Sequence, residues 1–347
     1  MKQLSTHQLI TLFASLEGGW DVRLPVRLPD GTRAMGKLSD APPALLGGPL
    51  PSKPTAAFFP QEEQVFMASE GEIRPSPTPE RPLLVAGFTA RDLECLRFID
   101  RFFATAPRDD LYFRCRETAL VAAVTGWCGP AGSFMKMAQG GCDLELVRDQ
   151  DEWLLLSYTE KGMSVTRGVP HRHDEGRLER LRQLSTTATG ADELLLRSAA
   201  ALLRDDLIPD SFWREIGDRC ILCTGCNLVC PTCSCFGIRD WRSAAQTQRS
   251  RIWDSCQLEG FMREAGGHNP LGSEALRSRR RIHHKLAADL LRWGEISCFL
   301  CGRCDAACPT GIGIVSVMKE MVSRYGKTTT YMTQEGVSTV DRSSRIR

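Results

Sequence analysis

The hydrophobic pattern divides the chain into a first half that mixes strands with helices and a second half that reads as mainly helical. Leu83–Phe88 is a continuous apolar run, which is typical of a buried strand, and Leu120–Val124 resembles it. Asp92–Ala104 carries apolar residues at helical spacing. Asp143–Arg148 and Trp153–Tyr158 flank a polar turn and predict a hairpin. We therefore expect an α+β or α/β fold for the first half.

The start of the chain and a proline-rich stretch complete the first half. Apolar positions from Leu9 to Leu16 predict an amphipathic first helix. Residues 42–82 contain ten of the nineteen prolines and should be mostly extended. Within them, Thr55–Phe59 and Gln64–Met67 are predicted to form short strands.

Helical patterns dominate after residue 190. Asp192–Leu203 is rich in leucine and alanine, and Ser211–Arg219 is a shorter helical segment. Ser255–Ala265 and Ser273–Trp293 are each followed by glycine, the residue that most often ends a helix. These patterns predict an all-α C-terminal domain.

Two cysteine motifs of the same spacing, C-x2-C-x2-C-x3-C-P, begin at Cys220 and at Cys298. This spacing is typical of ferredoxins with two [4Fe–4S] clusters, in which the fourth cysteine of each motif ligates the other cluster. Because the motif occurs twice, we predict two [4Fe–4S] clusters in a helical ferredoxin-type domain. The crossed arrangement assigns Cys220, Cys223, Cys226 and Cys308 to the first cluster, and Cys298, Cys301, Cys304 and Cys230 to the second.

Zinc is the alternative metal for these motifs. Structural zinc sites usually place two C-x2-C pairs a dozen or more residues apart, whereas here four cysteines lie within eleven residues, twice. The remaining cysteines show no disulfide framework, which indicates a reducing compartment. Cys233 and Cys235 are expected to be buried neighbours that hydrogen-bond to cluster sulfur. Whether Cys95, Cys115, Cys128, Cys142 or Cys256 bind anything is left open by the sequence.

Composition and charge exclude several function classes. Hydrophobic residues make up 42% and charged residues 25%, as in ordinary soluble proteins, and the net charge of +2 gives no general attraction to nucleic acid or membrane. The longest apolar runs are far shorter than the ~20 residues that cross a bilayer. No dinucleotide fingerprint or P-loop is found, so we expect no FAD or NAD in this chain. We predict a cytoplasmic protein that needs partner chains.

A basic segment before the second motif allows two interpretations. It contains Arg277, Arg279, Arg280, Arg281 and Lys285, with His283 and His284 among them. These side chains either form a solvated face or lie near an anionic cluster, where they stabilise it, raise its potential and present a docking surface. Both interpretations can hold for different residues. The histidines at positions 171 and 173 read as part of a solvated segment.

Several segments carry a resemblance to a known family. They are Cys220–Phe236 with its C-P-T-C-x-C-F ending, Trp253–Cys256, Ala265–Pro270, the basic helix ending at Leu286, the second cysteine motif, Phe58–Glu62 and Arg91–Leu93. The chain resembles the family of iron–sulfur subunits found in anaerobic sulfite reductases and, as the beta subunit, in cytoplasmic sulfhydrogenases. The resemblance implies a non-catalytic component that passes electrons between an FAD- and NAD(P)-binding subunit and a catalytic subunit. The latter is a sulfite reductase, a [NiFe] hydrogenase or a heterodisulfide-reductase-type module.

The chain departs from that family at one place. Relatives carry Cys-Asp where this sequence has Arg91-Asp92, and Cys-Phe-Cys where it has Ser133–Met135, together with a cysteine aligned with Cys128. Only Cys128 is retained here, and serine, methionine and arginine are poor replacements for thiolate. We therefore expect no third cluster, and about eight irons per chain from two [4Fe–4S] clusters.

These observations predict three regions: a mixed α/β docking domain at 1–190, a helical dicluster domain at 191–326 and a polar tail at 327–347. The predicted function is electron transfer. The alternative is an iron–sulfur protein with a structural or redox-sensing role that docks partners without relaying electrons.

Overall fold

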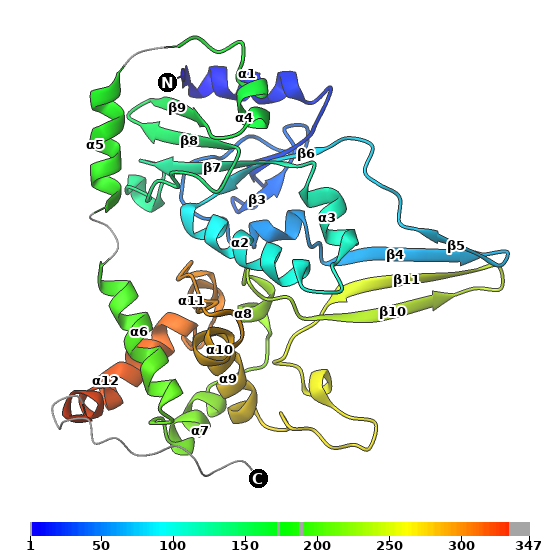
Figure 1. The fold of residues 1–347 in the computed structure, drawn as a ribbon, viewed down its shortest axis with the longest axis vertical. Coiled ribbons are helices and arrows are strands. Elements are labelled where there is room, and N and C mark those ends of the chain that lie inside the picture. The colour runs from blue at the N-terminus through cyan, green and yellow to red at the C-terminus, as the bar shows by residue number, and fades with distance from the viewer. Residues whose placement is uncertain (1, 172–173, 187–189, 333–347) are drawn as a thin grey trace.

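Two β-sheets and two groups of helices make up the chain, as the computed structural model shows (Figure 1). The structure describes residues 2–171, 174–186 and 190–332. The pair of histidines at 171 and 173 is therefore only partly within the described residues, and residues 333–347 of the expected tail lie outside them.

A seven-stranded mixed sheet forms the centre of the first half, with the strand order β1-β9-β8-β7-β6-β2-β3. Its strands are β1 (Lys2–Ser5), β2 (Asp21–Arg27), β3 (Arg33–Gly36), β6 (Leu83–Phe88), β7 (Leu120–Gly126), β8 (Leu144–Asp149) and β9 (Glu152–Ser157). The central strands β2, β6, β7 and β8 run parallel, and the outer pairs are antiparallel. The strands predicted at Leu83–Phe88 and Leu120–Val124 and the predicted hairpin are confirmed in this sheet.

Helices cover both faces of this sheet, which is why its central strands read as continuous apolar runs. Leu9 and Phe13 pack on one face, and Leu96 and Ile99 pack on the other. The helices are α1 (Thr6–Leu16), α2 (Ala90–Ala104), α3 (Asp110–Arg116), α4 (Glu160–Val165) and α5 (Glu175–Thr186). In Figure 1, α1 and α4 lie above the sheet, and α2 lies between the sheet and the C-terminal helices. The expected mixed α/β first half is thus confirmed.

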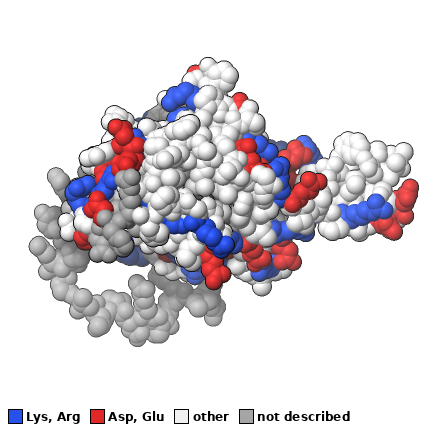
Figure 2. Space-filling view, turned by 90° about the horizontal axis from the view of Figure 1, so that it is seen from above, with Lys and Arg blue, Asp and Glu red and all other residues white. Residues whose placement is uncertain are grey.

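A second sheet of four antiparallel strands projects from the body as an arm (Figures 1 and 2). Its strands are β4 (Glu62–Ser69), β5 (Glu72–Pro75), β10 (Phe236–Arg242) and β11 (Gln246–Trp253), in the order β10-β11-β4-β5. Figure 2 shows charges of both signs on the arm and around the body, without one large patch of a single sign on that face. The arm joins strands from both halves of the sequence, because β11 pairs with β4.

This arm overturns the expectation of an all-α C-terminal domain, since β10 and β11 lie between the two cysteine motifs. The predicted helix at Ser255–Ala265 is also wrong: only a 3₁₀ turn forms, at Glu259–Met262, and its side chains face solvent without a core to bury them. The predicted strand at Thr55–Phe59 is wrong as well. Pro54–Ala57 forms a 3₁₀ turn that leads Phe58 and Phe59 into the core. The strand predicted at Gln64–Met67 is confirmed within β4.

The C-terminal helices surround the cysteine motifs. They are α6 (Gly190–Arg204), α7 (Asp210–Asp218), α8 (Gly225–Leu228), α9 (Glu274–His283), α10 (Asp289–Trp293), α11 (Arg303–Ala307) and α12 (Ile314–Met332), with a π-helical turn at His284–Ala288 between α9 and α10. Phe212, Leu286 and Met318 belong to their shared core. The predicted helix stop at Gly294 is confirmed, with a φ angle of 75°. No helix among the described residues is long and apolar enough to cross a membrane.

A buried ion pair joins the two halves. Arg303, inside the second cysteine motif, pairs with Asp92 near the start of α2, at nitrogen–oxygen distances of 2.5 and 3.0 Å. The Arg303 side chain is 2% exposed and the Asp92 side chain is fully buried. Arg303 Nε also donates to the Leu50 carbonyl at 2.8 Å. Removing one partner from such a pair leaves an unpaired charge in a medium that solvates it poorly.

The neighbouring contacts extend this interface. Arg91 donates to the Phe299 carbonyl at 3.0 Å, and the Phe98 ring lies 6.1 Å from Trp293 and 6.3 Å from Phe299. Glu295 accepts hydrogen bonds from arginines on α2. The helix α2 therefore holds the second cysteine motif against the first half of the chain.

We expect Asp92→Asn to lower the free energy of unfolding by about 3 kcal/mol, because the buried Arg303 charge loses its counter-ion. Asparagine keeps an oxygen that can cap α2. The matched control is Asp192→Asn, since Asp192 is 60% exposed and pairs with Arg91 at 3.6 Å; its effect should stay within about 0.5 kcal/mol. Anaerobic urea unfolding measures both. Equal effects of the two substitutions would show that the buried pair does not stabilise the fold.

Candidate metal centres

The two cysteine motifs adopt the same backbone shape. Leu222 and Thr224 in the first motif have φ angles of 56° and 60°, and Leu300 and Gly302 at the equivalent positions have 56° and 75°. Positive φ is unfavourable for leucine and more so for β-branched threonine, so the shape is imposed by the surroundings. In each motif these residues turn the chain into a short helix, α8 or α11. The sequence repeat is therefore a structural repeat.

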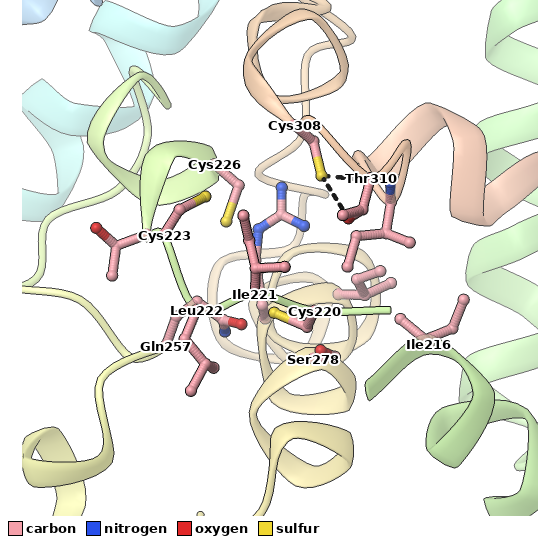
Figure 3. A pocket seen from close by; sticks show the side chains of 14 residues that line it. Ile216, Cys220, Ile221, Leu222, Cys223, Cys226, Gln257, Ser278, Cys308 and Thr310 are labelled. Atoms are coloured by element: carbon pink, nitrogen blue, oxygen red, sulfur yellow. Dashed lines mark hydrogen bonds between the residues drawn. The ribbon is translucent and has the colours of Figure 1, made fainter. Parts of the chain in front are cut away.

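Four cysteines line the first cavity, and they come from both motifs (Figure 3). Cys220, Cys223 and Cys226 approach from the loop before α8 and from α8 itself. Cys308 approaches from the loop after α11, where the Ile312 N–H donates to its sulfur at 3.4 Å. This is the set predicted for the first cluster.

The second cavity is lined by the complementary set. Cys298, Cys301 and Cys304 come from the second motif, and Cys230 comes from the end of the first. Cys95 of α2 also lines this cavity. Ile314 N–H donates to Cys304 Sγ at 3.5 Å. The structure thus brings together both predicted sets, while the ligation itself stays a prediction.

The cysteine arrangement differs from that of a mononuclear site. Among the residues that the structure describes, no three His, Cys, Asp or Glu side chains are placed to hold a single metal ion. A [4Fe–4S] cluster instead takes four cysteines, each on a different iron, so its ligands surround a space. The two cavities have this form.

A buried arginine lies between the two cysteine sets. Arg281 is 5% exposed and lines the first cavity. Its Nε has no hydrogen-bond partner among the described residues. Burial opposes its charge, but attraction to the sulfurs of Cys226 and Cys304, one from each set, raises the pKa of Arg281 above its ordinary value. Burial also raises the pKa of both thiols, so this attraction acts in full only when the cysteines are deprotonated as ligands. Buried charges in proteins are normally paired, so this guanidinium fits an anionic group in the cavity.

Lys285 plays a similar part beside the second cavity. It is 4% exposed, and its Nζ donates to Thr232 Oγ1 at 2.7 Å. Burial disfavours the charge, but attraction to the sulfurs of Cys230, Cys233 and Cys298, with Cys230 first, outweighs burial and holds the pKa of Lys285 well above its ordinary value. The pKa of Cys230 is itself well below its ordinary value, so this cysteine supplies the negative charge. The lysine therefore remains charged next to the cysteines.

Some residues of the basic segment form a solvated face and others lie beside the cysteines, so each of the two interpretations holds for part of it. Arg281 and Lys285 are buried beside the cysteines, whereas Arg280 is exposed. Arg279 pairs with Asp206 and Asp210 on the surface. The alternation follows from the helical period, which turns every third or fourth side chain toward the cavities.

Three of the positions singled out by the family resemblance, Arg91, Cys128 and Met135, lie near one another. Arg91 and Met135 line a third cavity that reaches Cys301. Cys128 Sγ lies 3.7 Å from Met135 Sδ. Lys136 lines the same cavity, so two cations face it. The absence of a third cluster remains a prediction.

Of the other cysteines, two belong to the core of the first half and three lie near the motifs. Cys142 is buried in that core, and Cys115 packs against it. The Cys233 thiol hydrogen-bonds to Cys230, as expected for a neighbour of a ligand. The Cys235 thiol instead hydrogen-bonds to Cys256, which the sequence did not indicate.

Comparison with known proteins identifies the type of domain and a relative. Residues 219–312 match the 4Fe-4S dicluster domain family. The chain is 26% identical over 277 residues to "Sulfhydrogenase 2 subunit beta" of Pyrococcus furiosus. This alignment covers 77% of this chain and 82% of that protein. No solved structure matches. The family resemblance expected from the sequence is confirmed, and the chain is an iron–sulfur electron-transfer subunit related to the beta subunits of sulfhydrogenases.

Proposed function

We propose that the chain relays electrons through two [4Fe–4S] clusters within an oxidoreductase complex. The observation that carries the proposal is the pair of cavities, each lined by three cysteines of one motif and the fourth of the other. When bound, the clusters would each accept and release one electron. The crossed cysteines interlock the two motifs and keep the two sites adjacent, which favours electron transfer between them.

The protein's own groups would set the potentials of these sites. Arg281 and Lys285 place buried positive charge beside the cysteines and favour the more negative, reduced state. The Ile312 and Ile314 N–H groups donate to cysteine sulfurs and act in the same direction. The site therefore has the groups by which a protein tunes a cluster.

The proposed partners are an FAD- and NAD(P)-binding subunit and a catalytic reductase or hydrogenase subunit. The relative is by its name one subunit of a sulfhydrogenase, which supports membership in a multisubunit complex. We propose that the α/β domain at 1–190 docks partners, that the dicluster domain at 191–326 carries the electrons, and that 327–347 is a tail. The proposed location is the cytoplasm.

An anaerobic redox titration of the purified chain tests the relay function against the structural alternative. A relay requires the visible absorption to bleach and recover reversibly at low potential. Clusters that resist reduction until the fold is lost would contradict electron transfer and support a purely structural or docking role.

The crossed ligation predicts which cluster each fourth cysteine serves. Cys223→Ser and Cys301→Ser define the EPR signals of the first and second clusters. Each substitution changes one of the three cysteines that a single motif contributes to its cavity. Cys230→Ser should then remove the same signal as Cys301→Ser, and Cys308→Ser the same signal as Cys223→Ser. Cys115→Ser, outside both cavities, is the control. If Cys230→Ser removes the signal that Cys223→Ser removes, the crossed assignment is wrong.

Lys285→Gln should lower the potential of the second cluster by on the order of 100 mV, because a buried positive charge that favours the reduced state is removed. The exposed Arg280 supplies the matched control as Arg280→Gln, whose effect is screened by solvent. Potentiometric EPR measures both shifts. Equal potentials in the two variants would show that Lys285 does not act on the cluster.

A further inference from the structure

Two cysteines outside both cavities form a contact pair at the base of the arm. Cys235 immediately precedes β10, and Cys256 follows β11. These strands pair with Phe236 opposite Trp253, and the Asp254 N–H donates to the Cys235 carbonyl at 3.0 Å. The hairpin therefore brings the two cysteines together, and the Cys235 thiol hydrogen-bonds to Cys256 Sγ.

Hydrogen-bond donors surround the sulfur of Cys256. The residue is 8% exposed, and the Asn227 side-chain amide donates to its sulfur at 3.1 Å. Gln257 Nε2 lies 3.8 Å from the same sulfur. The Cys235 thiol, followed by Asn227 and Gln257, lowers the pKa of Cys256 to about 5 despite burial. A thiolate beside a thiol is the arrangement from which a disulfide forms and is reduced.

The pair is linked to one predicted ligand of each cluster. Asn227, which holds Cys256, directly follows Cys226, and its Oδ1 lies 4.0 Å from Cys226 Sγ. On the other side, Cys233 lies two residues before Cys235 and hydrogen-bonds to Cys230. Asn227 therefore connects Cys256 to the first cysteine set, and Cys233 connects Cys235 to the second.

We propose that Cys235 and Cys256 form a redox-active dithiol that exchanges two electrons with the clusters, one with each. The proposal rests on the proposed function, since the clusters are its electron partners. On oxidation, a bond forms between the two sulfurs, Cys235 releases its proton, and one electron passes to each oxidised cluster. Reduction would reverse these steps: two electrons, one from each cluster site, would break the sulfur–sulfur bond, Cys235 would regain a proton and Cys256 would return to a thiolate.

Such a pair would act as a two-electron store within the chain. Nicotinamide cofactors exchange electron pairs as hydride, whereas each [4Fe–4S] cluster carries one electron at a time. Cys235 is only partly buried, which gives its proton access to solvent. Cys256 is buried, which protects the thiolate from bulk oxidants.

The test counts electrons and maps disulfides in the full chain with its clusters. The protein is oxidised anaerobically with glutathione disulfide, titrated with Ti(III) citrate, and sampled by acid quenching, alkylation and peptide mass mapping. Wild type should take up about four electrons per chain, two for the dithiol and one for each cluster, and its oxidised form should contain a Cys235–Cys256 cross-linked peptide. Cys235→Ser and Cys256→Ser should each take up about two electrons, because only the clusters remain. Cys115→Ser should match wild type.

Three outcomes would overturn the proposal. In the first, wild type takes up about two electrons and shows no cross-link. In the second, either serine variant loses iron, which would make the cysteine a metal ligand. In the third, the cross-link forms but wild type contains no iron, which would overturn the proposed function together with electron exchange between the dithiol and the clusters. The first outcome, combined with a normal iron content, would overturn the dithiol alone and leave the proposed function standing.

Discussion

Buried positive charge beside converging cysteines is the constraint on which the rest of the structure depends. Arg281 has an Nε without a partner among the described residues, and Lys285 has only a hydroxyl as its hydrogen-bond acceptor among those residues. A buried charge in this position is costly without a nearby anion, and cysteine thiolates that ligate a cluster would supply one. The helix that carries both residues is thereby held between the cavities. The proposed clusters would thus provide the negative charge that these two buried cations lack.

The same constraint joins the two halves of the chain. Arg303 lies inside the second motif and is fixed by Asp92 of α2, so the loop that carries Cys301 and Cys304 cannot move independently of the α/β domain. The arm adds a second link through the pairing of β11 with β4. Its base also carries Cys235 and Cys256. A partner that docks on the first half would therefore act on elements that contact the cluster sites directly.

Local sequence patterns correctly predicted the elements whose formation depends on residues close together in the sequence. The strand at Leu83–Phe88 has the predicted bounds because burial on both faces makes it continuously apolar. The cysteine spacing predicted both cavity sets, since tight turns bring three near neighbours together and the fourth follows the crossed arrangement of two-cluster ferredoxins. Other features that join distant segments were missed. The strands β10 and β11 are stabilised by β4, far away in sequence, and no local pattern relates Asp92 to Arg303 or Cys235 to Cys256.

The central claim is that eight cysteines hold two [4Fe–4S] clusters and that the third cavity, lined by Arg91 and Met135, holds none. Iron and acid-labile sulfide analysis of anaerobically prepared protein tests it most directly. We expect about eight irons and about eight sulfides per chain. A value near twelve would contradict the claim by requiring a third cluster, and a value near four would contradict it by leaving one cysteine set without a cluster.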